Sequence, residues 1–236
     1  MTPRRLFRLK KALHQRQTDL AVALEKVHDP HNLAAILRSA DAVGVSRVIW
    51  APDKDNPEPP NPEVSKSGEK WVELIQTQNI FEKLNELKSV GFNIAATHLA
   101  ADSIDFRKID WTKPWCVVMG NERKGCSDKI LSICDKNIQL PMMGLVQSLN
   151  VSVATAVIFY EIQRQRLEKG LYSKKLSKDE VIKFYNYWKL VEEGIQVEDL
   201  LNPPEVDDCL PDSPHQDGRA IFLEKREIEK QLKQKR

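Results

Sequence analysis

Short apolar runs alternate with amphipathic segments through the first two thirds of the chain. Runs of strand length, bounded by turn-forming residues, predict strands at residues 20–26, 47–51, 71–76, 92–98, 115–119 and 136–140. Apolar positions at helical spacing predict helices at residues 32–43, 79–90, 127–135 and 149–169. Strands that alternate with helices in this way are typical of an α/β domain with a largely parallel sheet.

Polar residues interrupt the apolar pattern where the last of these helices begins. Ser148, Asn150 and Ser152 follow a predicted strand and a short turn, so the helix start offers free backbone groups to a ligand. An ordinary helix start explains the same residues, with Ser148 as N-cap and Asn150 bonded to a neighbouring carbonyl. This segment on its own favours the ordinary helix start.

A second segment of interest, VHDPHNLAAILRSADAVGV, covers residues 27–45. Asp29 is a candidate N-cap, Pro30 suits the first helical turn, and Gly44 is a natural stop. Asn32 and Arg38 lie about 120° apart around the predicted helix, so they share one broad flank. A solvated arginine and a local asparagine hydrogen bond are the alternative interpretation.

The third segment, WCVVMGNERKGCS, covers residues 115–127 and ends a strand abruptly in a charged turn. Gly120 and Gly125 bracket this turn and let the backbone approach a ligand closely, with Glu122 between them. A plain surface turn uses the same residue types.

Composition bounds the class of protein. With 236 residues, 41% of them hydrophobic, the chain can bury one substantial core and an appendage. No window reaches 18 uninterrupted apolar residues and the N-terminus lacks a signal-peptide pattern, so we expect a cytoplasmic protein without membrane association. Four cysteines without C-x-x-C spacing favour neither a metal site nor disulfides, and the absence of any G-x-G argues against a dinucleotide site.

Charge is segregated along the chain although the net charge is only +2. Residues 1–16 carry six Lys or Arg and no acid, and residues 163–178 carry six against one acid. Residues 199–217 hold six acids, whereas residues 219–236 are again basic. A helix is predicted at residues 178–193 and a final charged helix after the acidic linker. The basic runs favour nonspecific contact with RNA phosphates, and solvated helix faces are the alternative, above all for the last run.

In their order along the chain, residues 27–45, 115–127 and 147–154, the three segments resemble the signature motifs of the SPOUT class of RNA methyltransferases. Within that class the chain is similar to the TrmH family, tRNA guanosine-2'-O-methyltransferases that act on guanosine 18 of the D-loop. The resemblance covers roughly residues 20–166 and is most specific in VHDPHNLAAILRSADAVGV, MGNERKG and QSLNVSVA. It implies a SPOUT domain at residues 20–170 with helices on both faces of the sheet, a basic helical extension at residues 1–19 and a charged helical extension at residues 171–236.

The resemblance also implies a cofactor, partners and site residues. The family binds S-adenosylmethionine in a C-terminal trefoil knot, a topology that is rare among folds, and works as a homodimer on tRNA. By motif position, the catalytic set is Arg38, Asn32, Glu122, Ser148 and Asn150, and the cofactor contacts are Thr97, Gly120, Leu140 and Leu149. The expected RNA contacts are Arg8, Lys11, Arg164 and Arg166, and no metal is implied.

The role of Arg38 follows from the resemblance, which assigns it to activation of the ribose hydroxyl. A guanidinium is a poor base because its pKa exceeds 12, so Arg38 acts either as a base or as a cation that orients the hydroxyl. Two alternatives to guanosine 18 methylation remain open. One is ribose methylation of another RNA, since the motifs encode the chemistry better than the target; the other is an RNA-binding protein without turnover.

Overall fold

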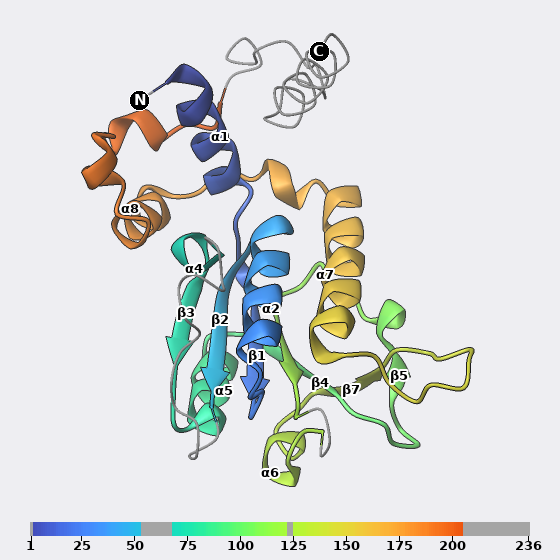
Figure 1. Cartoon of the computed structure of the whole chain (residues 1–236). Helices are drawn as coiled ribbons and strands as arrows, with labels where there is room; N and C mark the ends of the chain where they lie inside the picture. Colours follow the sequence, from blue (N-terminus) through green and yellow to red (C-terminus); the bar gives the residue numbers. More distant parts are fainter. Residues whose placement is uncertain (1, 53–67, 122–124, 205–236) are drawn as a thin grey trace, which may run out of the picture.

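A single parallel sheet forms the centre of the molecule. The computed structural model describes residues 2–52, 68–121 and 125–204. In this part of the chain seven parallel strands lie in the order β3-β2-β1-β6-β4-β7-β5. Their bounds are β1 Gln17–Glu25, β2 Val45–Ala51, β3 Glu73–Gln76, β4 Asn93–Thr97, β5 Ile104–Asp105, β6 Trp115–Met119 and β7 Lys136–Gln139. The predicted α/β fold with a largely parallel sheet is confirmed (Figure 1).

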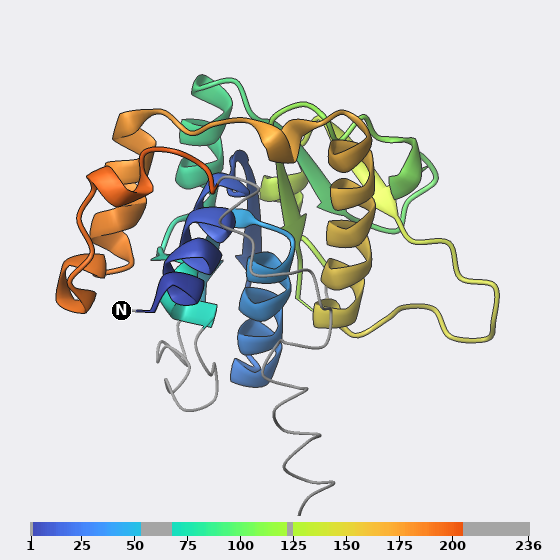
Figure 2. The ribbon, with the colours of Figure 1, turned by 90° about the horizontal axis from the view of Figure 1, so that it is seen from above.

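Helices cover both faces of the sheet. α2 (Pro30–Ala42) and α7 (Val151–Glu168) lie side by side on one face, while α5 (Ile80–Ser89) lies on the other (Figure 2). The short helix α6 (Asp128–Leu131) adds its buried Ile130 to the α5 side of the core. Residues of β1 alternate between the two cores, with Val22 on the α2 side and Ala23 on the α5 side.

A separate apolar cluster lies beside the sheet. α1 (Pro3–His14) and α8 (Lys178–Tyr187) pack there with the 3₁₀ turns Leu190–Glu193 and Glu198–Leu200, and the buried Leu13, Phe184 and Trp188 fill its centre. The turn Leu171–Ser173 leads from α7 towards this cluster, which also receives Trp71 from the short helix α4 (Gly68–Trp71). The predicted basic N-terminal helix is therefore α1 (Figure 1).

Several predicted boundaries differ from the structure. The strand expected at residues 71–76 begins at Glu73, because Trp71 ends α4. The helix expected at residues 178–193 ends at Tyr187, because Lys189 adopts a left-handed conformation with φ of 52°. The helix expected at residues 127–135 spans only Asp128–Leu131. A final charged helix was also expected, but residues 205–236 lie outside the described part of the chain.

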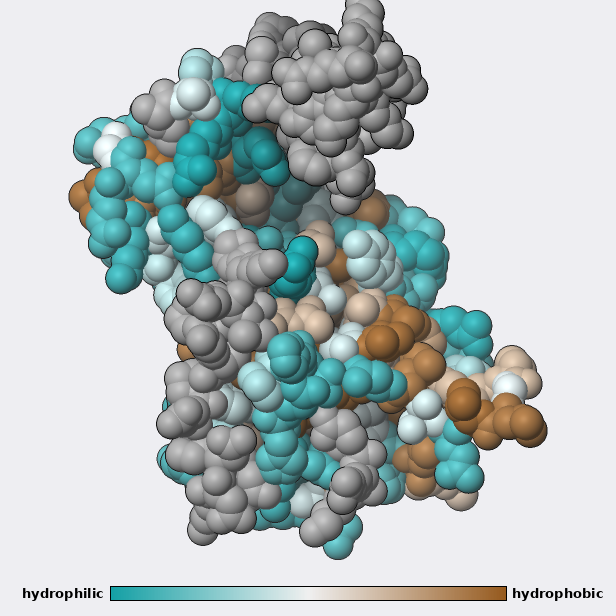
Figure 3. Space-filling model, viewed as in Figure 1, coloured by the Kyte–Doolittle hydropathy of each residue, from teal (hydrophilic) through white to brown (hydrophobic). Residues whose placement is uncertain are grey.

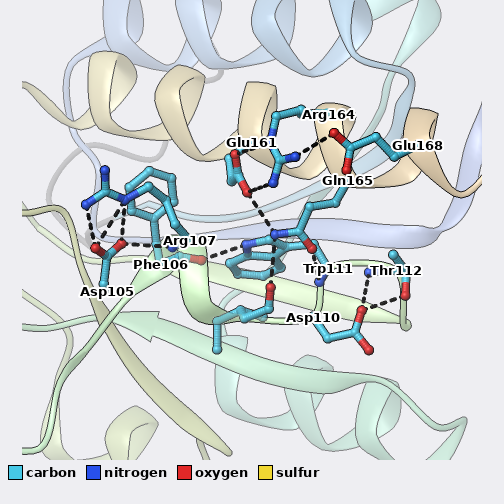
Figure 4. Close-up of polar contacts among 11 residues, drawn as sticks. Asp105, Phe106, Arg107, Asp110, Trp111, Thr112, Glu161, Arg164, Gln165 and Glu168 are labelled. Atoms are coloured by element: carbon cyan, nitrogen blue, oxygen red, sulfur yellow. Dashed lines mark hydrogen bonds and ion pairs between the residues drawn. The ribbon is translucent and has the colours of Figure 1, made fainter.

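The path from β4 to β6 is the most unusual part of the topology. β5 follows β4 along the chain, yet β7 lies between them in the sheet. After β5, the 3₁₀ turn Phe106–Lys108 leads to a segment that α7 holds in place: the Trp111 N–H donates to Gln165 Oε1 at 2.9 Å, and Gln165 Nε2 donates to the Ile109 carbonyl at 3.1 Å (Figure 4). This segment thus lies on the α7 side of the sheet.

No helix in the described ranges has the length and apolar character needed to cross a membrane.

Candidate active site

A cavity of about 440 Å³ opens at the carboxyl ends of β4, β6 and β7. These strands are neighbours in the sheet, so the loops that leave them converge at one edge, which is where open α/β sheets bind ligands. Each of the loops contributes wall residues, and the segment from β7 to α7 closes the side. The lining includes Thr97, His98, Met119, Gly120, Asn121, Gln139, Leu140, Met142, Ser148, Leu149, Val151 and Ala154.

All four residues expected to contact the cofactor line this cavity: Thr97, Gly120, Leu140 and Leu149. The Thr97 hydroxyl donates to the Val118 carbonyl at 3.2 Å, so its lone pairs are left to accept a hydrogen bond from a ligand. Ser148, from the expected catalytic set, lines the same cavity. The mixture of apolar side chains with backbone and hydroxyl groups suits a ligand that is part apolar and part polar.

Position 120 requires glycine for a steric reason that the sequence does not reveal. A Cβ on Gly120 would lie 2.2 Å from the Gly125 carbonyl carbon and 2.3 Å from the Cys126 nitrogen. Asn121 and Gly125 pair through two backbone hydrogen bonds of 3.1 and 2.8 Å. The close approach predicted for Gly120 is therefore first of all an approach to the other end of its own turn.

The N-termini of α2 and α7 meet through two asparagines. Asn150 Nδ2 donates to Asn32 Oδ1 at 3.1 Å, and Asn32 is buried. Asn150 is the N-cap of α7, since its Oδ1 accepts from the Ser152 N–H at 2.8 Å. The ordinary helix-start interpretation predicted Ser148 as the N-cap, and this was wrong because Asn150 is the cap. Asp29 does cap α2 as predicted, accepting from the His31 N–H at 2.8 Å.

The remaining two residues of the expected catalytic set do not join this contact. Arg38 is exposed on α2, six residues or about 9 Å along the helix from Asn32, and it is not part of the cavity wall. Glu122 lies outside the described residues. The structure therefore brings together Asn32 and Asn150 beside a cavity that Ser148 lines.

The prediction that Arg166 contacts RNA phosphates is wrong, because its side chain is only 1% exposed. Its guanidinium donates to Asp19 Oδ1 at 2.6 Å, to Gln17 Oε1 at 3.0 Å, and to two carbonyls of residues 111 and 113. Arg166 thus joins α7 to β1 and to the segment before β6, and its donors are already used inside the protein.

The other three expected RNA contacts are exposed. Arg164 lies on the surface of α7, where it is paired with Glu161 at 2.8 Å and Glu168 at 2.7 Å (Figure 4). Lys11 is exposed on α1. Arg8 lines a hollow of about 590 Å³ whose wall includes four arginines and one acid: Thr2, Arg4, Arg5, Arg8, Leu9, Ala12, Arg16, Asp41 and Trp71.

Sequence analysis missed His98, Asn121 and Gln139, which also line the cavity. Each of them adjoins the carboxyl end of a strand that the sequence did predict, and this position is the signal that would have found them. Cys126 lies behind the same turn, and burial raises the pKa of its thiol well above the usual range. It is therefore a neutral thiol at physiological pH. Among the described residues, no group of three or more His, Cys, Asp or Glu side chains is placed to hold a metal.

Comparisons with known proteins agree with this geometry. Residues 19–160 match the SpoU rRNA Methylase family. The tRNA (guanosine(18)-2'-O)-methyltransferase of Aquifex aeolicus (strain VF5) is 45% identical over 186 residues, which cover 78% of this chain and 88% of the relative.

Solved structures are similar over the same region. The crystal structure of the A. aeolicus TrmH/SpoU tRNA modifying enzyme has a TM-score of 0.75 at 44% identity and covers 82% of this chain and 98% of that chain. The SpoU methyltransferase AviRb from Streptomyces viridochromogenes, solved in complex with the cofactor AdoMet, has a TM-score of 0.56 at 27% identity and covers 64% of this chain and 62% of that chain.

Proposed function

The chain belongs to the SpoU rRNA Methylase family, and we propose that it methylates the ribose 2'-hydroxyl of guanosine 18 in the D-loop of tRNA. S-adenosylmethionine is the methyl donor in this proposal. The observation that carries it is the cavity at the carboxyl ends of β4, β6 and β7, next to the Asn32–Asn150 contact. The guanosine 18 target comes from the name of the A. aeolicus relative, which matches over most of its length.

The cavity fits S-adenosylmethionine in size and chemistry. A volume of about 440 Å³ lies within the range of small-molecule sites. Leu140 and Leu149 would pack against the apolar parts of the cofactor, while Thr97 and the backbone at Gly120 would meet its polar groups. Bound there, the cofactor supplies an electrophilic methyl group on a sulfonium.

The protein side of the reaction is mainly positioning. The ribose 2'-oxygen attacks the methyl carbon as the carbon–sulfur bond breaks, so the hydroxyl must be aligned in line and must lose its proton. Asn150 stands where the two helix starts meet and aligns Arg38 or the ribose, while Ser148 stabilises the turn before α7. Arg38 orients the hydroxyl and stabilises the developing alkoxide, and Glu122 shapes the junction between cofactor and ribose.

Basic residues of α1 support contact with tRNA. The hollow that Arg8 lines also contains Arg4 and Arg5 of α1. Its wall includes Arg16 as well, which is buried and paired with Asp41, one turn of α2 beyond Arg38. A phosphate in this hollow would therefore lie near the ribose that Arg38 serves. Lys11 and Arg164 extend the basic surface. Such contacts position the RNA without reading its sequence, and their contribution falls as salt rises.

We also propose a homodimer, a cytoplasmic location and the trefoil knot. The knot is supported by the position of β7 between β4 and β5. The homodimer is supported by apolar side chains exposed along α7. The SPOUT domain at residues 20–170 with two helical extensions stays a prediction, as the family match ends at residue 160.

The test is transfer of labelled methyl from S-adenosylmethionine to unmodified tRNA, followed by nuclease mapping of the labelled nucleotide. We expect label on the ribose of guanosine 18, and none on a tRNA whose guanosine 18 is already 2'-O-methylated. Label at another position, or on ribosomal RNA as the family description suggests, would keep the chemistry and overturn the target. Absence of label on every RNA would leave a noncatalytic RNA-binding protein.

A further inference from the structure

We infer that Glu25, at the end of β1, is a positioning residue that holds the turn after β6 as a wall of the cofactor cavity. This inference rests on the proposed function, because the cavity is taken as the S-adenosylmethionine site. Glu25 is not part of the cavity lining, so it acts through the turn and not on the ligand.

The first contact is a pair of hydrogen bonds to Ser127. Glu25 Oε2 accepts from the Ser127 N–H at 2.8 Å, and Oε1 accepts from the Ser127 hydroxyl at 2.6 Å. Glu25 is buried, only 6% exposed, whereas Ser127 is exposed, so both bonds are partly buried. Charge-assisted bonds of this length are about twice as strong as neutral ones.

Ser127 contacts Glu25 and does not cap its helix with the side chain. It stands at the N-cap of α6, where a serine hydroxyl normally accepts from the helix, yet it makes no such side-chain bond. A serine cap is worth about 1 kcal/mol. The hydroxyl is directed to the Glu25 carboxylate at the end of β1.

The second contact lies at the other end of the turn. Asn121 Nδ2 donates to the carbonyl of Lys26, the residue after Glu25, at 3.0 Å. Lys26 has a φ of 55°, a conformation that costs a side-chain-bearing residue about 1–2 kcal/mol. The backbone thus adopts an unfavourable conformation where the Lys26 carbonyl meets Asn121. Both described ends of the turn are therefore attached to two successive residues of one strand end.

The strand end is a suitable anchor because β1 is central. It pairs with β2 on one side and β6 on the other, and the Lys26 N–H donates to the Ala51 carbonyl at 2.9 Å. The turn it holds contributes Gly120, Asn121 and Gly125 to the cavity. Loss of the Glu25 carboxylate would remove both bonds that tie Ser127, itself exposed, to the end of β1, and would release one end of that wall.

The test compares Glu25→Gln with Glu25→Ala in the full chain. Glutamine can accept from the Ser127 N–H and donate to its hydroxyl oxygen, so it keeps both contacts without the charge. Alanine keeps neither. Val181→Ala in α8 is the control for general loss of stability, since Val181 is buried in the separate cluster around α1.

Two measurements are made on each variant. The first is amide hydrogen exchange of residues 120–127 in the ligand-free protein, which needs no cofactor. The second is the dissociation constant for S-adenosylmethionine by calorimetry. We expect Glu25→Ala to exchange faster in this segment and to bind about tenfold more weakly, whereas Glu25→Gln stays within about twofold of the parent.

Each outcome decides a different point. Unchanged exchange and affinity in Glu25→Ala would overturn the inference, and so would an equal loss in Glu25→Gln or in Val181→Ala. A parent protein that does not bind S-adenosylmethionine would overturn the proposed function instead. The exchange measurement would then still decide whether Glu25 holds the turn.

Discussion

Arg38 is exposed on α2, whereas Asn32 on the same helix is buried and accepts from Asn150. A side chain that binds RNA must be reachable, and its removal should leave the cavity at the strand ends intact. We therefore expect Arg38→Ala to lower methyl transfer by about 10²–10³-fold or more while binding S-adenosylmethionine like the parent. Single-turnover assays and calorimetry check the two parts.

Arg38→Lys is the matched variant for this prediction. Lysine keeps the positive charge but lacks the planar donors of a guanidinium, so it should recover only part of the rate. Near-normal turnover in Arg38→Ala would remove Arg38 from the mechanism, and lost cofactor binding would place it in the cavity wall instead.

Arg164 and Arg166 make a second pair of contrasting residues on one helix. Arg166 is 1% exposed and bonded to Asp19, whereas Arg164 is 54% exposed at its side chain and bonded to two acids of α7 itself. Asp19 is 41% exposed, so the cost of removing Arg166 comes mainly from the acceptors left without a donor, Gln17 and the carbonyls of residues 111 and 113. Leaving a buried polar group unpaired costs about 1–3 kcal/mol, so we expect Arg166→Ala to lower the free energy of unfolding by about 2–3 kcal/mol. Urea unfolding of both alanine variants measures this, with Arg164→Ala expected to match the parent. Equal stability of the two variants would contradict it.

The burial of Arg166 had a signal in the sequence that the charge pattern obscured. Ile158, Ile162 and Arg166 recur every four residues, and the two isoleucines are fully buried on the sheet side of α7. An arginine in line with them belongs to the same inward stripe. What could not be predicted is its partner, because Asp19 lies 147 residues earlier in the sequence.

At the level of elements, α1 is attached to the C-terminal cluster through a histidine. The His14 ring is buried, with the Leu176 N–H donating to Nδ1 at 3.4 Å and Nε2 lying 3.0 Å from the Leu200 carbonyl. These partners suit the neutral ring with its proton on Nε2. Burial lowers the pKa of His14 below 6.5, and the nearby charges of Lys175 and Lys10 act in the same direction.

This lowered pKa predicts a loss of stability in mild acid. Below pH 6.5 the unfolded chain takes up a proton that folded His14 resists, so the folded state is penalised progressively as the pH falls. We expect the free energy of unfolding to decrease more steeply from pH 7.5 to 5 in the parent than in His14→Gln, whose side chain does not titrate. Urea titrations at several pH values give both slopes, and identical slopes would refute the assignment.

Helices and strands with a clear apolar periodicity could be predicted from the sequence. Elements that depend on pairing with a distant strand could not. β6 has the bounds that its apolar run indicated, and α2 has the predicted Asp29 cap. β5 has two residues, too few for any period, and exists because Ile104 pairs with Ile138. The apolar pattern of α8 continues to Val191, but the helix ends at Tyr187 because the backbone of Lys189 adopts a left-handed conformation. Such features depend on tertiary contacts that local pattern does not encode.

At the scale of the whole molecule, strand order was the missing information. Each loop that lines the cavity follows a strand that the sequence predicted, but the order β6-β4-β7 that brings the loops together follows no sequence rule. The motif resemblance supplied Thr97, Gly120, Leu140, Ser148 and Leu149 before any strand order was known. The apolar periodicity of the sequence could therefore not have predicted that these residues share one cavity.

One apolar surface remains unexplained by a single copy of the chain. Val153, Val157 and Tyr160 recur at i, i+4 and i+7 on α7, with 48%, 41% and 56% of their surfaces exposed. The exposed Met143 and Leu145 precede them in the loop after β7. Figure 3 shows this apolar surface over α7 and the loop. Exposed patches of this kind mark association surfaces, and the proposed homodimer would cover it.

A charge placed in this surface should separate the two copies. We expect Val157→Asp to convert a dimer into a monomer in analytical ultracentrifugation, because the carboxylate would be buried without a partner in the interface. Val90→Asp is the control, as Val90 is 70% exposed at the end of α5, away from α7, and should leave the dimer intact. The same loop carries Ser148 and Leu149 into the cavity, so the Val157→Asp monomer should also bind S-adenosylmethionine more weakly. A monomeric parent, or a dimeric Val157→Asp, would show that this surface serves another purpose.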